Sequence, residues 1–164
     1  MSDRSAVEAF WDLAKFHAKL NNAPTYFGPT TLEVLPPPAW SFGANEQQAD
    51  DLLSLVLDGT KTATAGALWD FESENEPLPE PGSLSIILDG RGHPRALIEC
   101  TAIDVVPFDQ VDEEHALLEG EGDLSLEHWR GVHERFFTEV ATHEHGFQQD
   151  MPVVLERFRV VYQA

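Results

Sequence analysis

The stretch Asp58-Gly59-Thr60-Lys61-Thr62-Ala63-Thr64-Ala65-Gly66 follows an apolar helical pattern and precedes the strands expected later in the chain. Lys61 is the only lysine after Lys19, in a chain with 10 Lys and Arg against 29 Asp and Glu. A cation in so acidic a chain is expected to serve a site rather than solubility. Gly59 and Gly66 bracket the stretch, and glycine permits a helix-ending positive φ, a turn or close approach of another group. We therefore expect an exposed loop that presents Lys61 and threonine hydroxyls to a small anionic or carbonyl-bearing group.

The same stretch also fits an ordinary connection between a helix and a strand, in which the threonines bond their own backbone. Local sequence leaves both alternatives open. The helix before it is expected to begin after Asn45, the N-cap residue, and to end at Gly59. Its apolar stripe consists of Ala49, Leu52, Leu53, Val56 and Leu57.

Composition and charge limit the class of protein. The chain has 164 residues, 42% of them hydrophobic, which suits one compact domain. The sequence has neither an apolar run of about 18 residues nor a basic segment followed by an apolar one at the N-terminus, so we expect no membrane partner and no secretion. Cys100 is the single cysteine, which excludes an internal disulfide and fits a cytoplasmic protein. The net charge of −19 argues against duplex DNA as a partner.

The remaining elements follow from periodicity and turn signals. Apolar residues at helical spacing predict helices over residues 6–20, 111–118 and 126–142. Two apolar runs joined by a Gly-rich turn predict a hairpin of strands over residues 83–89 and 95–106. Alternation predicts a final strand over residues 152–162, whereas residues 70–81, with their acids and prolines, are expected to form a solvated loop.

Several polar residues within or between these elements are candidates for a site. Glu99 interrupts an apolar strand, so it lies either on a wet face or in a cleft, where burial would raise the pKa of its carboxyl group. His133 lies within an apolar helix face and is interpreted as a core histidine, with a functional role as the alternative. Residues 119–123 carry three acids and are expected to form a solvated turn, with a hard-cation site as the alternative. Histidine and cysteine spacings do not fit a zinc site, and we expect no metal and no cofactor.

Six ordered motifs from Ala39 to the C-terminus resemble the ASCH-domain family of the PUA-like superfamily. They are Trp40-Ser41-Phe42-Gly43, Gly59-Thr60-Lys61-Thr62-Ala63-Thr64, Leu88-Asp89-Gly90, Val106-Pro107-Phe108, Glu119-Gly120-Glu121-Gly122-Asp123, and Trp129-Arg130 with His133 and Phe136-Phe137. The resemblance implies an α+β fold, a PUA-like, partly open β-barrel flanked by helices. Residues 1–38 would form an N-terminal helix and extended lead-in, and residues 39–164 the ASCH domain, as one compact unit.

The resemblance further implies RNA or nucleoside chemistry, because members resemble RNA-binding modules, ribonucleases, or amidohydrolases that remove an acyl group from modified cytidine. The hydrolase trio of Lys, Thr and Glu corresponds to Lys61, Thr64 and Glu99. The residues expected to contact the substrate are Thr62, Phe42, Trp69, Trp129, Arg130 and His133.

We therefore expect a hydrolase for RNA or an RNA-derived nucleoside, either ribonuclease-like or acylcytidine amidohydrolase-like. The alternative is a non-catalytic RNA- or nucleotide-binding module. Because the chain is so acidic, the expected partner is a short single-stranded RNA or a nucleoside. Lys61→Ala is expected to abolish activity with little loss of stability, because an exposed loop lysine contributes little to folding.

Overall fold

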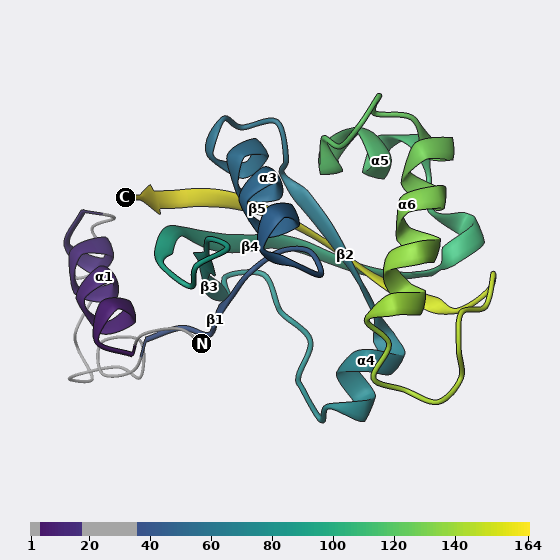
Figure 1. Cartoon of the computed structure of the whole chain (residues 1–164), viewed down its shortest axis with the longest axis horizontal. Helices are drawn as coiled ribbons and strands as arrows, with labels where there is room; N and C mark the ends of the chain where they lie inside the picture. Colours follow the sequence, from purple (N-terminus) through teal and green to yellow (C-terminus); the bar gives the residue numbers. More distant parts are fainter. Residues whose placement is uncertain (1–3, 18–35) are drawn as a thin grey trace. The chain divides into compact units, whose positions relative to one another are not determined.

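The computed structural model describes residues 4–17 and 36–164, which form both helices and strands (Figure 1). The described helices are α1 (Arg4–His17), α3 (Glu46–Leu57), α4 (Leu68–Ser73), α5 (Glu113–Glu119) and α6 (Leu126–Glu139), with a 3-10 turn, η2 (Phe108–Gln110). The strands are β1 (Ala39–Trp40), β2 (Ala63–Ala67), β3 (Leu84–Leu88), β4 (Pro94–Pro107) and β5 (Pro152–Gln163). This content confirms the predicted α+β class.

The strands form one mixed sheet in the order β1-β3-β4-β5-β2. β1 runs parallel to β3, while β3 pairs with β4 and β2 pairs with β5 in antiparallel fashion. β1 and β2 are the two edges, so the sheet is open. Within the described ranges, none of the helices has both the length and the apolar character of a membrane span.

The chain divides into two compact units, the first of which comprises residues 1–53, 84–99 and 160–164. Its core joins one face of α1 to strands β3 and β4, and its buried residues are Val7, Phe10, Trp11, Ala14, Leu84, Ile86, Leu88 and Leu97. The apolar face predicted for the first helix is thus confirmed. The helix already begins at Arg4, and predicted helical residues 18–20 lie outside the described residues.

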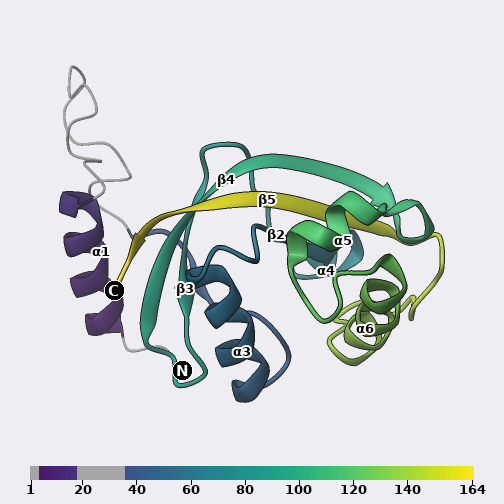
Figure 2. The same ribbon diagram turned by 90° about the horizontal axis from the view of Figure 1, so that it is seen from above.

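The second unit comprises residues 54–83 and 100–159. Its core is built from β2, β5, α5 and α6, and its buried residues are Ala67, Phe108, Val111, Ala116, Trp129, Phe137, Met151 and Val153. Figure 2 shows α5 and α6 side by side, in agreement with the contacts between them. The elements that carry Lys61 and Thr64 belong to this unit.

Most helix ends and the hairpin were predictable from local signals. Asn45 caps α3, because its Oδ1 accepts the N–H of Gln48 at 2.9 Å. Gly59 has a φ of 87°, the left-handed conformation expected after the helix. Ser125 caps α6 through the N–H of His128, although the helix already ends at Glu139. Antiparallel β3 and β4 confirm the hairpin.

The segment after Lys61 corrects two predictions. Residues 63–67 form strand β2 rather than the second half of a loop, because they pair with residues 153–157 of β5. Gly66 lies inside this strand, where a Cβ atom would come within 3.0 Å of the Phe71 ring, so the glycine permits close approach rather than a turn. Part of the predicted solvated loop is helix α4, which is held by bonds from the Thr142 backbone and hydroxyl to Asp70 Oδ1 at 2.8 and 3.1 Å.

Candidate functional site

Lys61 lies between the end of α3 and the start of β2, and the residue is only 2% exposed. Its backbone N–H donates to the carbonyl of Leu55 at 3.0 Å, which folds the connection back onto α3. The N–H of Thr62 donates to the carbonyl of Leu118 at 2.8 Å, which joins the same connection to α5. The prediction of an exposed loop lysine is therefore wrong, because these bonds draw the side chain into the interior of the second unit.

The Lys61 ammonium is held by two carboxylates. Its Nζ donates to Glu119 Oε1 at 3.1 Å, to Glu121 Oε2 at 3.2 Å and to the Glu119 carbonyl at 3.5 Å. The Lys61 and Glu119 side chains are each 1% exposed, whereas that of Glu121 is 20% exposed. A buried ammonium costs several kcal/mol unless paired, and these two carboxylates supply the pairing. The partly exposed Glu121 marks where this cluster meets solvent.

Glu119 accepts hydrogen bonds from its own helix, from α6 and from the lysine connection. Its Oε2 accepts from His115 Nε2 at 2.7 Å and from the indole N–H of Trp129, while its Oε1 faces His133 Nε2 at 3.4 Å as well as Lys61. Trp129 and His133 lie one turn apart on α6, and their rings stack at 4.2 Å. His133 Nδ1 is 2.9 Å from the Trp129 carbonyl, so it donates there and leaves Nε2 toward Glu119.

The cluster favours opposite charges on Glu119 and His133. Burial alone would raise the pKa of Glu119, but the Lys61 ammonium, His133 and the bond from His115 hold that pKa well below its usual range. Burial opposes protonation of His133, yet the Glu119 carboxylate outweighs it and raises the pKa of the imidazole. A carboxylate that accepts from so many donors is a firmly held anion and a weak base.

These shifts predict a stability that depends on pH above the ordinary histidine value of 6.5. The pKa of His133 lies above its ordinary value of 6.5, so its stabilising charge is fully present below that pH and is lost as pH rises through the folded-state pKa. We expect the wild-type melting temperature to fall over this alkaline range and His133→Gln to flatten that part of the curve. Thermal unfolding followed by circular dichroism between about pH 5 and 9 measures the effect.

His128→Asn is the matched control, because His128 lies on the same helix but is exposed. Its curve should keep the wild-type slope above neutrality. Glu119 acts with the opposite sign: its depressed pKa gives stability that is present above its ordinary value of 4.5 and lost as pH falls through the folded-state pKa. An identical alkaline slope in wild type and His133→Gln would contradict the assigned imidazolium.

Thr64 lies three residues beyond Lys61, on strand β2, where its Cα partner is Glu156 on β5. Paired residues of antiparallel strands point to the same face, so the Thr64 hydroxyl and the Glu156 carboxyl share one face of the β2–β5 pair. Thr64 is half-buried and Glu156 is 8% exposed. Burial raises the pKa of Glu156, and a hydrogen bond with the Cys100 side chain partly opposes this rise.

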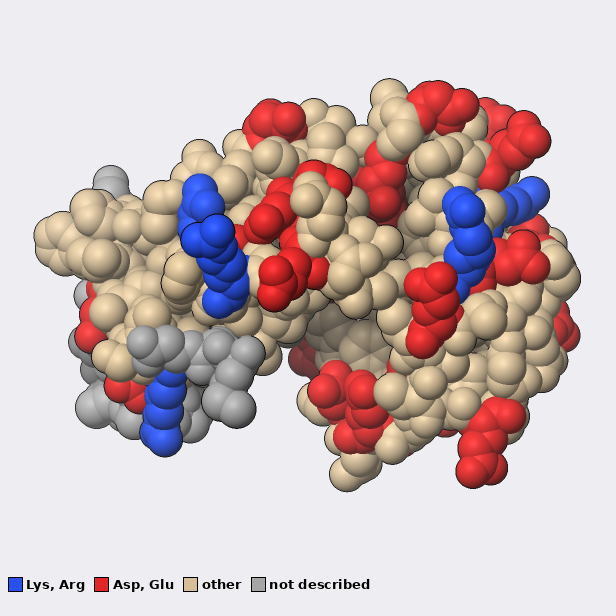
Figure 3. Space-filling view, viewed as in Figure 1, with Lys and Arg blue, Asp and Glu red and all other residues tan. Residues whose placement is uncertain are grey.

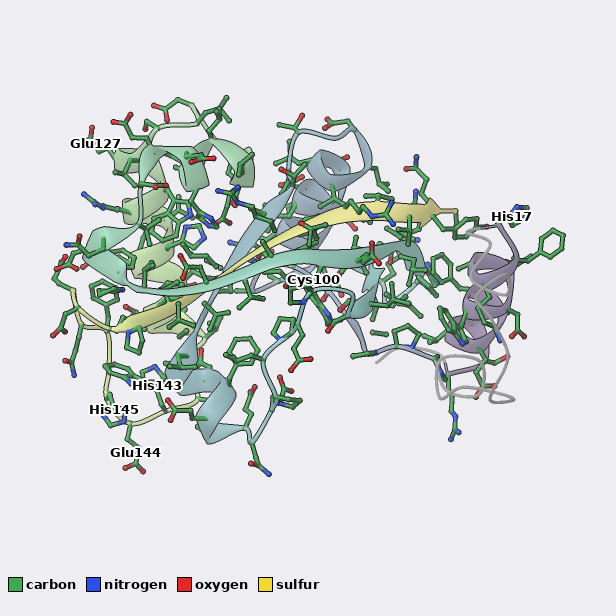
Figure 4. All side chains as sticks on the ribbon, turned by 180° about the vertical axis from the view of Figure 1, so that it is seen from behind. His17, Cys100, Glu127, His143, Glu144 and His145 are labelled. Atoms are coloured by element: carbon green, nitrogen blue, oxygen red, sulfur yellow. The ribbon has the colours of Figure 1, made fainter. Side chains whose placement is uncertain are left out.

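The other residues predicted for substrate contact in the second unit are already packed against protein. The Trp69 ring lies 5.2 Å from the ring of His143 and 4.6 Å from that of His145, which follow α6 (Figure 4). Arg130 Nη2 donates to two backbone carbonyls at and just after η2, at 3.2 and 3.3 Å. Trp129 and His133 are buried in the Lys61 cluster. The predicted substrate contacts of these four residues stay predictions.

Phe42 and Glu99 belong to the first unit. Phe42 is 5% exposed, and its ring meets that of Trp40 edge-on at 4.8 Å. Glu99 is half-buried on β4, opposite Leu84 of β3. The roles predicted for Phe42 in base stacking and for Glu99 in proton transfer stay predictions.

Sequence reasoning missed the acids that hold Lys61. Residues 119–123 were expected to form a solvated turn, which is wrong for Glu119 because that residue is 1% exposed. The glycine at position 120 was one signal available in the sequence. In the structure its φ is 73°, and a Cβ atom there would come within 2.5 Å of the Thr60 carbonyl. The turn packs directly on the lysine connection. The possible ligand atoms of Glu119, Glu121 and His133 lie close enough together to hold a metal ion. The Lys61 ammonium, however, already bonds both carboxylates.

Comparison with known proteins agrees with this architecture. The sequence model of the ASCH domain matches residues 38–162. The crystal structure of protein EF3133 from Enterococcus faecalis V583 has a TM-score of 0.79 and 34% identity, covering 95% of this chain and 88% of that chain. The ASCH domain from Lactobacillus crispatus JV V101 has a TM-score of 0.80 and 29% identity, covering 98% of this chain and 96% of that chain. A search of curated proteins gives no match.

The matched span, residues 38–162, contains the lysine connection, the hairpin and α6, which are the elements that carried the resemblance at the level of sequence. It also contains all the residues of the buried Lys61 cluster. The chain belongs to the ASCH-domain family.

Proposed function

We propose that the chain is a hydrolase for an RNA-derived nucleoside, with acylated cytidine as the substrate class and Lys61 and Thr64 in the site. The observation that carries the proposal is the buried Lys61 ammonium, held by Glu119 and Glu121 directly before the strand that presents the Thr64 hydroxyl. Lys61 precedes β2 by two residues and Thr64 is the second residue of the strand, so both belong to one short segment of the chain.

Lys61 acts as a fixed donor to the carbonyl oxygen of the acyl group. Glu119 holds the ammonium from the buried side, while the partly exposed Glu121 can yield its place to a ligand oxygen. A donor that is already in position stabilises the negative charge of a tetrahedral intermediate without reorganisation, which is worth roughly 100- to 1,000-fold in rate for one such group. In this role Glu119 is a positioning residue for Lys61.

Thr64 acts as the nucleophile. A hydroxyl needs a base to remove its proton, and the sequence predicts Glu99 for that role. Glu119 is poorly suited to it, because its oxygens already accept bonds from His115, Trp129 and Lys61. A turnover assay with acylated cytidine and with single-stranded RNA, monitored by chromatography of the released products, tests the proposal directly. Absence of product from both substrates would exclude a hydrolase of this kind.

The distribution of charge supports a small substrate over a long RNA. The chain has 10 Lys and Arg against 29 Asp and Glu, and one of those cations, Lys61, is buried. On the face shown in Figure 3, Lys and Arg side chains occur singly or in small groups among acids. A long polyanion would have to bind across this acidic surface, whereas a nucleoside needs only the local site.

The salt dependence of binding is expected to be shallow. Each phosphate contact of a single strand contributes about 0.7 to the slope of log K against log salt, and we expect about two contacts or fewer. The slope for a short fluorescent RNA, measured by anisotropy, should therefore not exceed about 1.4, and that for acylated cytidine, measured by calorimetry, should be near zero. A steep slope together with activity that rises with RNA length would establish a polymer substrate instead.

The alternative is a non-catalytic module that binds a nucleotide. It is favoured by a cavity of about 330 Å³ in the second unit, whose lining includes Gln110, His115 and Arg157. A guanidinium and an amide can bind a phosphate and a base edge without chemistry. Tight binding with no product, together with loss of binding in Arg157→Ala, would support the module over the hydrolase.

A further inference from the structure

We propose that the cavity beside α5 binds the base of an uncharged nucleoside, and that the buried His115 and the exposed Arg157 recognise the edge of that base. The choice of cytidine as the nucleoside rests on the proposed function, whereas the site itself rests on the lining of the cavity. The two side chains determine which base is accepted, a role that neither Lys61 nor Thr64 fills.

The cavity has a volume of about 330 Å³, which is enough for a nucleoside-sized ligand. β4 and β5 supply the apolar part of its lining, which includes Ala102, Val106 and Leu155. Polar groups come from these strands, from η2 and from the start of α5, and they include the side-chain amide of Gln110. An apolar surface suits the flat faces of a base, and an amide can bond ribose hydroxyls. The lining therefore has the mixed composition of a small-molecule site.

His115 is a buried polar residue of this lining, and its side chain is 4% exposed. Its Nε2 lies 2.7 Å from Glu119 Oε2. Because the donors around Glu119 hold its pKa low, its oxygens only accept, and Nε2 carries the ring proton. In the neutral imidazole Nδ1 is then an acceptor, and no group of the described residues donates a hydrogen bond to it. Nδ1 is thus left to accept an N–H from a ligand.

Arg157 supplies the complementary donors. Its Nη2 lies 3.3 Å from Glu114 Oε1, and the two side chains are 47% and 66% exposed. An ion pair so exposed contributes little to stability, so the guanidinium can turn from Glu114 to a ligand. The edge of cytosine carries an amino donor beside a ring nitrogen and a carbonyl oxygen that accept. The amino N–H fits Nδ1 of His115, and the two acceptors fit the fork of guanidinium donors.

The charge of the lining favours a nucleoside over a nucleotide. Asp104 and Asp112 line the cavity together with Arg157, and Glu114 pairs with that arginine. Three carboxylates against one guanidinium repel a phosphate group, whereas an uncharged base and ribose meet no such repulsion. Arg157 is therefore better suited to the edge of a base than to a phosphate.

One carboxylate joins the cavity to the Lys61 cluster. Glu119 Oε2 accepts from His115 at 2.7 Å, while Glu119 Oε1 accepts from Lys61 at 3.1 Å. A base that bonds Nδ1 fixes the imidazole ring, and the ring in turn fixes the carboxylate that positions Lys61. Binding of the base thereby acts on the same cluster that carries the proposed function.

Titration of the isotope-labelled protein with nucleosides, followed by NMR, tests the site without any turnover. We expect cytidine to bind at least about 10-fold more tightly than uridine, which has a carbonyl oxygen in place of the amino donor. It should exceed cytidine monophosphate by a similar factor because of the acids. Arg157→Ala should weaken cytidine binding by about 10-fold or more. Arg159→Ala is the matched control, because Arg159 is exposed on the same strand but lies outside the cavity lining, and its affinity should equal that of the wild type.

His115→Gln tests the recognition by Nδ1. A glutamine amide can donate to Glu119 from near the position of Nε2, but it has no acceptor where Nδ1 lies. We expect this variant to bind cytidine and uridine about equally, because the acceptor for the amino group is gone. If circular dichroism shows the variant to be unfolded, the decision passes to Arg157→Ala, whose exposed side chain is not needed for folding, and to the comparison of ligands on the wild type.

The outcomes separate this site from the proposed hydrolase. Equal affinity of the wild type for cytidine and uridine, tighter binding of the monophosphate, no binding of any of the three, or full cytidine affinity in Arg157→Ala would each overturn the inference. Turnover of acylated cytidine with unchanged kinetics in Arg157→Ala and His115→Gln would leave the hydrolase standing and refute the base site. Cytidine binding that depends on Arg157, without turnover of acylated cytidine, would support the base site and refute the hydrolase.

Discussion

Lys61→Ala is expected to lower the free energy of unfolding by about 3–5 kcal/mol, the usual cost of removing one partner from a buried ion pair. The reason is that the substitution leaves the Glu119 carboxylate buried without its ammonium, at a site where both side chains are 1% exposed. Urea unfolding followed by tryptophan fluorescence measures the loss. The structure thereby reverses the expectation from sequence, in which an exposed loop lysine contributed little to stability.

The control for this prediction is Arg4→Ala. Arg4 and Glu8 form an ion pair at the same 3.1 Å separation, but their side chains are 93% and 54% exposed. An exposed pair contributes about 0–1 kcal/mol, so a small change is expected there. The double variant Lys61→Ala, Glu119→Gln should lose less stability than the two single losses added together, because a neutral amide no longer needs a cation. If the two losses of stability simply add, Lys61 and Glu119 contribute independently to the free energy of unfolding.

Lys61→Arg is expected to have little turnover even if the variant protein folds. The planar guanidinium is larger than an ammonium and spreads its charge, so it cannot bond Glu119 and Glu121 in the same compact space. A fall in turnover greater than the fall in stability would separate the role of Lys61 as a donor from its role in folding. Wild-type turnover by the arginine variant would exclude a specific function for the ammonium.

The parts of the fold that sequence predicted are those set by local chemistry. Asn45 and Ser125 were predictable N-caps because each bonds an N–H only three residues ahead. Gly59 was predictable because a positive φ at a helix end needs no distant partner. The hairpin was readable because its two apolar runs lie next to each other in the chain. None of these features depends on tertiary packing.

The elements that sequence missed are set by distant partners. Strand β2 is rich in alanine and glycine and has little pattern of its own; it exists because residues 153–157 pair with it. Helix α4 likewise depends on a hydrogen bond from Thr142, which is distant in sequence, to Asp70. The charge of Lys61 was conspicuous in an acidic chain, but the burial of Glu119 depends on a contact 58 residues away, which no local window contains.

The same limit explains the choice of acid for the site. Glu99 attracted attention because it interrupts an apolar strand, a signal visible in the sequence alone. Glu119 lies in an acidic turn, and its bond to Lys61 appears only once the packing of α5 against the lysine connection is known. The sequence therefore singled out Lys61 and Thr64 as candidates, while the contacts of both residues follow from tertiary structure.

Thr64→Ala is expected to abolish turnover of acylated cytidine, with a fall in kcat of at least about 1,000-fold, because removal of a nucleophile leaves only binding and the oxyanion donor. Thr64 is half-buried, and the loss of a hydroxyl and a methyl group at such a position should cost no more than about 1 kcal/mol of stability. Thr64→Ser, which keeps the hydroxyl, should retain most of the activity. Steady-state kinetics and thermal unfolding of the two variants give the comparison.

Thr101→Ala provides the control, because Thr101 is an exposed threonine on β4 and its removal should leave kcat and KM unchanged. Binding of acylated cytidine to Thr64→Ala should remain near the wild-type affinity, since the Lys61 donor is still in place. A threonine that served only to bind substrate would instead raise KM and leave kcat near the wild-type value. Full turnover by Thr64→Ala would mean that water attacks the acyl carbon directly, and the hydrolase would then have to depend on Lys61 without a covalent intermediate.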